Sequence, residues 1–173
     1  MKKVFLGIGS NLGDRELNLK ETLEKIEKNI GPVLKSSSVY ETEPWGFESD
    51  NQFLNMVVKA DTRLTPSGVL GAILMIEAFL GRTRGDKQYA SRIIDIDILL
   101  YEDTVIDEVS LKIPHPLMHE RRFVLVPLCE IDPDLVHPVL NRTIASLLEI
   151  CEDRSKVRKY MTHNHSNPLS AKL

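Results

Sequence analysis

The sequence predicts an α+β fold with a ferredoxin-like βαββαβ core, in which an antiparallel sheet has helices packed on one side. Runs rich in β-branched residues and segments of helical periodicity come in the order β-α-β-β-α-β between Met1 and Tyr101. Each helical segment ends at a glycine, Gly31 or Gly81. A C-terminal helical and hairpin extension is expected beyond this core. A length of 173 residues suits one domain.

The first strand and the first helix are joined by a glycine-containing segment. Residues 3–8 are mostly apolar and predict a strand. GSNLGD, residues 9–14, is interpreted as a tight strand-to-helix turn, because Leu12 stands where a dinucleotide-binding fingerprint requires its third glycine. Apolar residues from Leu17 to Ile30 recur at mostly helical spacing and predict the first helix.

Two strands and a second helix form the middle of the core. Residues 33–40 and 53–60 predict strands. Residues 42–52 contain Pro, Gly, Asp and Asn and predict a loop between them. Thr65-Pro66 is a typical N-cap and first-turn pair, so we expect a helix from there to Leu80.

The last strand of the core carries two aspartates. In the apolar run IIDIDILLY, residues 93–101, Asp95 and Asp97 are two apart and therefore share one face of a strand. Two adjacent carboxylates repel each other and require a cation. A divalent metal such as Mg²⁺, which usually brings phosphates with it, is the simplest candidate. The alternative is the solvated face of an edge strand, with both carboxylates paired to Lys or Arg.

Beyond the core, the pattern is less regular. Residues 105–113 predict a short hairpin or strand, residues 115–131 a helix around their middle with Pro127 in or near it, and residues 143–151 a last helix. We expect one domain over residues 1–151, followed by a polar, loosely ordered tail over residues 152–173.

Arginines lie on both sides of the acidic strand in the sequence. Arg82, Arg84 and Arg92 precede it in a basic, glycine-containing loop, and Arg121 follows it. A guanidinium group grips phosphate oxygens bidentately, so arginines that converge on an acidic pair fit binding of a Mg-nucleotide. The alternative, which the spacing leaves equally open, is that these arginines only pair with the aspartates.

Aromatic residues indicate a site for a flat ligand. Phe53 and Asn55 share a strand face, and Phe123 follows the later arginine. An aromatic ring can stack on a heterocycle, and an amide can read its donor and acceptor edge. The alternative is that both phenylalanines are core residues.

Composition excludes several classes of protein. The net charge is −3, which argues against a broad nucleic-acid footprint. Hydrophobic residues make up 42%, yet no apolar run is long enough to span a membrane and no signal peptide is recognised. The two cysteines, Cys129 and Cys151, are interpreted as free buried thiols of a cytoplasmic protein.

Several of these segments are similar to one known family. They are GIGSNLGD, YETEPWG, FLNMVV, GRTRG, SRIIDIDIL and IPHPLMHERRFVLVPLCEI, and together they extend from near Met1 to about Cys151. The order and spacing of R-x-x-D-x-D, followed by Pro-His and then Arg, are specific. On these residues the chain resembles the 6-hydroxymethyl-7,8-dihydropterin pyrophosphokinases of folate biosynthesis.

The resemblance implies an activity, two substrates and a set of residues. Pyrophosphate would pass from ATP to the hydroxymethyl group of 6-hydroxymethyl-7,8-dihydropterin, giving the pterin diphosphate and AMP. Two Mg²⁺ ions would be bound with ATP by Asp95 and Asp97. Catalysis would depend on Arg82, Arg92, Asp95 and Asp97. ATP would contact Glu77, Arg84, Tyr89, Arg92, Ile98, His115 and Arg121. The pterin would contact Thr42, Glu43, Trp45, Phe53, Asn55, Asp95 and Phe123. The protein would act as a monomer or weak homo-oligomer.

The chain departs from the family pattern beside the nucleotide. Tyr89 stands where many relatives have tryptophan, and Pro116 where an aromatic can occur. Leu74 occupies a helix position that is polar in some relatives, and Ser110 and Lys112 replace side chains that can also contact ATP. These departures concern the adenine and ribose contacts and leave the predicted activity unchanged.

Two other classes of function are weaker alternatives. A nucleotidyltransferase also uses Gly-Ser and Asp-x-Asp, but there the two normally lie close together, whereas Gly9-Ser10 and Asp95 are separated by most of the domain. A ferredoxin-like module that binds RNA would place aromatic residues and basic edges on its open sheet face. Aspartates on that face argue against RNA.

Overall fold

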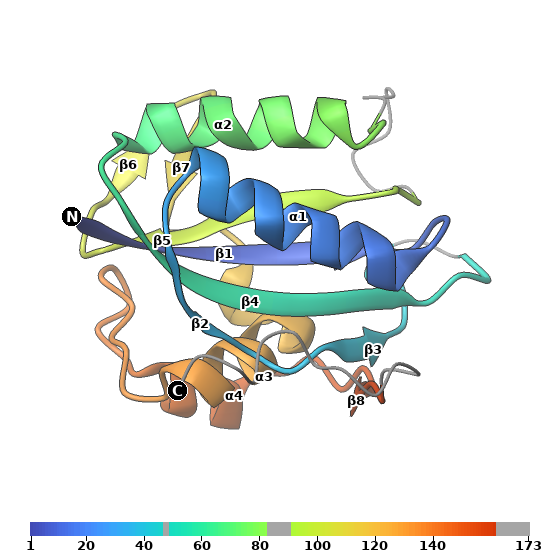
Figure 1. The fold of residues 1–173 in the computed structure, drawn as a ribbon. Helices are drawn as coiled ribbons and strands as arrows, with labels where there is room; N and C mark the ends of the chain where they lie inside the picture. Colours follow the sequence, from blue (N-terminus) through green and yellow to red (C-terminus); the bar gives the residue numbers. More distant parts are fainter. Residues whose placement is uncertain (47–48, 83–90, 162–173) are drawn as a thin grey trace.

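The computed structural model describes residues 1–46, 49–82 and 91–161, and it shows helices packed around one antiparallel sheet (Figure 1). Five of the six strands are ordered β5-β1-β4-β3-β8, where β8 is Val157–Lys159, and the sixth, β2, pairs with β4 beside β3. The strands of the core are β1 (Lys2–Ser10), β2 (Val33–Ser36), β3 (Tyr40–Thr42), β4 (Phe53–Thr62) and β5 (Asp95–Tyr101). This order, with β1 between β4 and β5, confirms the predicted ferredoxin-like class.

The helices lie on both faces of the sheet (Figure 1). Helices α1 (Arg15–Asn29) and α2 (Pro66–Phe79) pack on one face, as predicted, and are capped by Asp14 and Thr65. In the extension, α3 (Arg122–Ile131) and α4 (Ile144–Ile150) cover part of the opposite face. None of the helices in the described ranges is long and apolar enough to cross a bilayer.

The remaining elements of the extension are short. A hairpin of β6 (Ile106–Asp107) and β7 (Lys112–Ile113) leads to a 3-10 turn over Met118–Glu120. The predicted hairpin, the helix containing Pro127 and the last helix are all confirmed.

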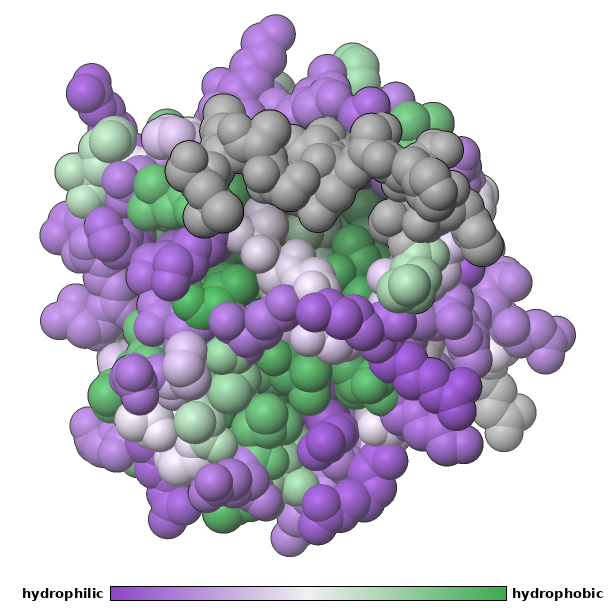
Figure 2. Space-filling model, turned by 60° about the horizontal axis from the view of Figure 1, so that its bottom comes forward, coloured by the Kyte–Doolittle hydropathy of each residue, from purple (hydrophilic) through white to green (hydrophobic). Residues whose placement is uncertain are grey.

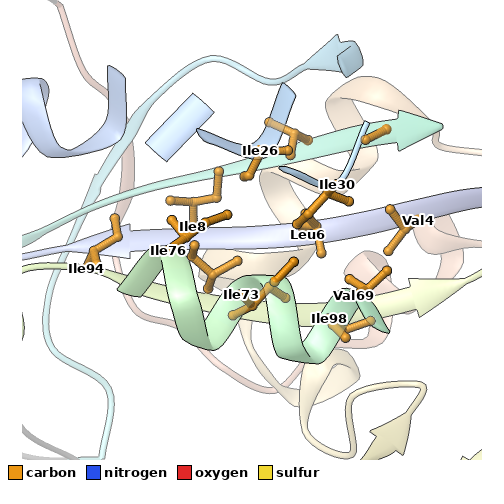
Figure 3. Close-up of a cluster of buried hydrophobic side chains, with 14 of the residues drawn as sticks. Val4, Leu6, Ile8, Ile26, Ile30, Val69, Ile73, Ile76, Ile94 and Ile98 are labelled. Carbon is orange, nitrogen blue, oxygen red and sulfur yellow. The ribbon is translucent and has the colours of Figure 1, made fainter. Parts of the chain in front are cut away.

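The first face of the sheet carries the main apolar core. Val4, Leu6 and Ile8 of β1 point from this face toward α1 and α2. Figure 3 shows Ile73 and Ile76 of α2 among them. Because alternate strand residues share a face, the other half of each strand is left to face the extension.

The second core covers only part of the opposite face. Phe5, Val57 and Leu99 pack against Leu125 and Leu128 of α3. The surface on this side is a mixture of hydrophilic and hydrophobic side chains (Figure 2). The part of the sheet that α3 leaves uncovered includes the far end of β1 and the start of β5, where the aspartates lie.

The predicted single strand over residues 33–40 is divided into β2 and β3. At the division, the Ser37 hydroxyl oxygen accepts a hydrogen bond from the Val57 N–H at 3.0 Å, and the Ser37 N–H donates to the Val57 carbonyl at 2.9 Å. A side-chain oxygen thus replaces a main-chain acceptor of the ladder, which interrupts the strand.

The prediction of a loosely ordered tail from residue 152 is wrong for its first part. Val157–Lys159 forms β8, which pairs antiparallel with β3. The Tyr160 N–H donates to the Val39 carbonyl at 2.8 Å, and its hydroxyl donates to Glu16 at 2.8 Å. This polar segment is ordered by partners far earlier in the chain. Residues 162–173 lie outside the described residues, and the division at residue 151 stays a prediction.

We expect Gly31→Ala to destabilise the protein by about 1–3 kcal/mol or more. Gly31 ends α1 with a φ of 148°, and a Cβ there would lie 2.0 Å from the Asp61 carbonyl oxygen of β4. The matched control is Gly71→Ala on α2, where a Cβ meets nothing within 4 Å. Because alanine favours a helix, this control should stabilise by about 0.5–1 kcal/mol. Urea unfolding measures both, and equal stabilities would contradict the expectation.

Candidate active site

Two rows of residues across the uncovered sheet face bring the predicted site residues together. Gly9 of β1 is paired with Asn55 of β4 on one side and with Asp95 of β5 on the other. Gly7 is likewise flanked by Val57 and Asp97. Directly paired residues in a sheet point to the same face. The amide and the two carboxylates therefore flank a stretch of the central strand, Gly7 to Gly9, that carries no side chain on this face.

The two glycines form the floor of the site. The interpretation of residues 9–14 as a turn is wrong at its start, because β1 continues through Ser10. A Cβ on Gly9 would lie 2.7 Å from Asn55 Oδ1 and 3.6 Å from Phe53. Alternating glycines inside a strand leave one face bare, and this pattern is the signal that could have located the floor from sequence.

Two pockets meet at the aspartates: the first opens on this face, and the second lies at the edge strand β5, beside α2. The first is lined by Thr42, Glu43, Trp45, Phe53, Asn55, Arg92, Asp95, Asp97, His115, Arg121 and Phe123, together with the glycine floor. The second is lined by Leu74, Glu77, Arg82, Asp95, Asp97, Ile98, Ser110, Lys112 and His115, among others. Asp95, Asp97 and His115 belong to both. Arg84 and Tyr89, also predicted to contact ATP, lie outside the described residues.

The first pocket combines aromatic walls with a polar edge. Asn55 Nδ2 donates to Thr42 Oγ1 at 2.6 Å, which orients the amide and leaves Oδ1 directed over Gly9. Phe53 enters from β4 and Phe123 from the first turn of α3. The two phenylalanines thus line a pocket, where the sequence had also allowed a role in the core.

Arg121 brings a buried cation to the first pocket. Its side chain precedes α3 and is largely enclosed, with 8% of the residue exposed. The guanidinium carbon lies 4.6 Å from the ring centre of Trp45 and 5.8 Å from that of Phe123. Its buried Nε has no hydrogen-bond partner among the described residues. Cation–π contacts stabilise the charge, and a buried N–H without a protein partner suits an anionic ligand.

Asp95 is paired with both predicted catalytic arginines. Its carboxylate lies 2.6 Å from Arg82 and 2.7 Å from Arg92. Arg82 also pairs with Glu77, whose Oε1 accepts the Ile96 N–H at 2.9 Å. These ion pairs are the arrangement that the sequence left open as an alternative. The arginines are nevertheless at the junction of the two pockets, where a polyphosphate could take the place of the carboxylate.

The pKa values of Asp97 and His115 are shifted in opposite directions. Burial in the protein is the larger cause that raises the pKa of Asp97, and the negative charge of Asp95 is the second. Because 41% of the Asp97 side chain is exposed to solvent, the effect of burial is reduced. Burial, and to a lesser extent the positive charge of Arg121, lowers the pKa of His115 to about 4. At neutral pH the imidazole is therefore uncharged. Its Nδ1 accepts the Leu117 N–H at 3.2 Å, so Nε2 carries the proton, 3.9 Å from Asp97.

The two carboxylates fit a magnesium–phosphate complex better than a metal held by protein alone. Within the part of the chain that the structure describes, no group of three or more His, Cys, Asp or Glu residues could hold a metal ion. Mg²⁺ prefers hard oxygen ligands and commonly takes one or two carboxylates, with water and substrate phosphates completing its shell. Asp95 and Asp97 supply that number and type of ligand.

The sequence profile of 7,8-dihydro-6-hydroxymethylpterin-pyrophosphokinase (HPPK) matches residues 5–133. The chain belongs to this family. It is 44% identical over 144 residues to a 2-amino-4-hydroxy-6-hydroxymethyldihydropteridine pyrophosphokinase of Aquifex aeolicus, covering 83% of this chain and 89% of that protein. A protein of the same name in Methylorubrum extorquens is 45% identical over 137 residues, covering 79% of this chain and 86% of the relative.

Solved structures of the family share the fold. A crystal structure of an HPPK-DHPS in complex with substrates superposes with a TM-score of 0.71 at 17% identity. The HPPK-DHPS of Plasmodium falciparum gives a TM-score of 0.70 at 21% identity. Each match covers 86% of this chain, which spans less than half of those longer chains, 43% in both cases.

Family membership confirms the resemblance and the activity predicted from the sequence. Enzymes of this family transfer a pyrophosphoryl group to hydroxymethyldihydropterin in folate biosynthesis. The alternatives of a nucleotidyltransferase and of an RNA-binding module are therefore rejected.

We expect Gly9→Ala to weaken binding of 6-hydroxymethyl-7,8-dihydropterin by about 10-fold or more, since a few lost contacts amount to more than about 1.4 kcal/mol. The added methyl group would displace the Asn55 amide and the Phe53 ring from the positions they hold over the floor. Calorimetric titration of the folded variant measures the change. The control is again Gly71→Ala, which should bind as the wild type does, and unchanged affinity in Gly9→Ala would contradict the assignment of the floor.

Proposed function

We propose that the first pocket binds the pterin, that the second pocket binds ATP, and that the reaction occurs where they meet, at Asp95, Asp97 and His115. The observation that supports this most strongly is that the two pockets share these residues. One pocket has aromatic walls and an oriented amide. The other ends at a pair of carboxylates beside arginines.

The pterin ring is held between Phe53 and Phe123, with its edge read by Asn55. The Thr42 hydroxyl fixes which end of the Asn55 amide faces inward, so Oδ1 accepts from an amino or ring N–H of the pterin. Glu43 and Trp45, which also line this pocket, close it from the side of the loop. This geometry directs the hydroxymethyl group toward the carboxylates at the other end of the pocket.

ATP enters through the second pocket with its phosphates toward Asp95 and Asp97. Two Mg²⁺ ions bound with ATP would be held by these carboxylates and would neutralise charge on the phosphate oxygens. Glu77, Ile98, Leu74, Ser110 and Lys112 line the side of this pocket that is available to the nucleoside. We assign Arg84 and Tyr89 to the same nucleotide on the resemblance alone.

The reaction is a displacement at the β-phosphorus of ATP. The pterin hydroxyl oxygen forms a bond to this phosphorus, the bond to the oxygen bridging the α- and β-phosphates breaks, and AMP leaves with that oxygen. The hydroxyl proton is released. Arg82 and Arg92 exchange Asp95 for oxygens of the transferring group, and Arg121 and the Nε2–H of neutral His115 supply further donors. Such groups act by positioning and charge stabilisation, and no covalent intermediate is required.

We further propose that the protein acts in the cytoplasm, as a monomer or weak homo-oligomer, without a nucleic-acid or membrane partner. The net charge of −3 and the two unpaired cysteines support this.

The direct test of the function is the identity of the nucleotide product. Incubation with MgATP and 6-hydroxymethyl-7,8-dihydropterin should give AMP and the pterin diphosphate in equal amounts, with no free pyrophosphate. Anion-exchange chromatography separates the nucleotides. ADP as the product, or AMP formation that does not require the pterin, would overturn the proposal.

Asp97→Asn should abolish turnover and weaken binding of MgATP, because the amide loses the negative charge that holds Mg²⁺. Pterin affinity in the absence of metal should stay nearly unchanged. Isothermal titration with each ligand separates the two effects. Asp103→Asn, an exposed position just beyond β5, is the matched control and should behave as the wild type. Normal MgATP affinity in Asp97→Asn would refute the assignment of this carboxylate.

A further inference from the structure

The segment between β1 and α1 holds the peptide of Arg92 through one buried side chain. Asn11 is only 2% exposed. Its Oδ1 accepts the Arg92 N–H at 2.7 Å, and its own main-chain N–H donates to the Arg92 carbonyl at 3.1 Å. Two hydrogen bonds from one residue thus bracket the residue that carries the guanidinium beside Asp95.

The other end of the Asn11 amide reaches the loop on the pterin side. Nδ2 donates to Ser91 Oγ at 3.0 Å and lies 3.4 Å from the carbonyl oxygen of Asn51. Ser91 Oγ is in turn 3.2 Å from Ser49 Oγ. Asn11 therefore joins three segments that are far apart in the sequence: the end of β1, the end of the loop over residues 42–52, and the residues before β5.

An amide is the side chain that suits this position. The Arg92 N–H requires an acceptor, whereas Ser91 Oγ and the Asn51 carbonyl can use a donor, and an amide provides both. The turn itself does not need this side chain, because Asp14 caps α1 by accepting the Leu17 N–H at 3.0 Å. The contacts of Asn11 are thus directed at the site rather than at local secondary structure.

We propose that Asn11 is a positioning residue for the reaction. It fixes the backbone of Arg92 relative to the loop over residues 42–52, and thereby places the Arg92 guanidinium beside Asp95. The inference rests on the proposed role of Arg92 in transfer. It gives a function to Asn11 of GSNLGD, which neither the glycine floor nor the helix cap explains. Displacement of a catalytic group by about 1 Å can cost about 100-fold in rate, so this anchor has a measurable effect.

A double-mutant cycle in the full-length protein tests the inference. Asn11→Ala should lower kcat by about 10–100-fold and change the KM values for MgATP and pterin by less than about 3-fold. The double variant Asn11→Ala/Arg92→Ala should have a kcat within about 3-fold of that of Arg92→Ala alone, because both changes remove the same contribution.

Thr22→Ala is the matched control. Thr22 is buried in α1, and its hydroxyl donates to the Asn18 carbonyl at 2.7 Å, away from the site. This control should keep kcat within about 2-fold of the wild type.

A second measurement does not depend on turnover. Amide hydrogen exchange of Arg92 in ligand-free protein should be about 10-fold faster or more in Asn11→Ala than in Thr22→Ala, because the N–H loses its acceptor. Unchanged exchange, or effects on kcat that multiply fully in the double variant, would overturn the inference about Asn11 alone. An unchanged kcat in Arg92→Ala would instead overturn the proposed role of Arg92, and the inference with it.

Discussion

The arrangement of this protein depends on one electrostatic constraint: two carboxylates that share a strand face must be neutralised. Asp95 and Asp97 point away from the apolar core, onto the half of the sheet that α3 does not cover. Arginines reach Asp95 from two segments, and a neutral imidazole lies beside Asp97. Positive charge is thus already present where we propose that the polyphosphate of ATP binds, and a site arranged in advance needs less reorganisation.

The different roles of the two sheet faces follow from this constraint. One face is covered by α1 and α2 and supplies the main core. The other face is closed by α3 at one end and left open at the other, where Gly7 and Gly9 remove side chains from the central strand. Because glycine in a strand weakens the sheet, these positions favour ligand access over stability. The second core around Phe5 and Leu99 stabilises the sheet from the same side.

Polar side chains at the edge of the site connect its parts. Asn55 is oriented by Thr42, Arg82 by Glu77, and the Arg92 peptide by Asn11. In each case a buried or half-buried polar group is bonded to a residue from another segment of the chain. Buried polar groups are costly unless they are paired, so such networks hold one geometry well. The predicted effect of Asn11 on catalysis is one expression of this rule.

Local patterns in the sequence determined the fold class, the helix limits at Thr65-Pro66 and Gly31, and the shared face of Asp95 and Asp97, because these depend on strand and helix periodicity within a few residues. The resemblance to a family added the site residues, most of which the structure brings to two adjoining pockets. Only the tertiary structure decided that Asn55, Asp95 and Asp97 flank the two glycines in one site, that Ser37 divides a strand, and that β8 lies in a polar segment. These depend on inter-strand register and on partners distant in the chain, which no local spacing encodes.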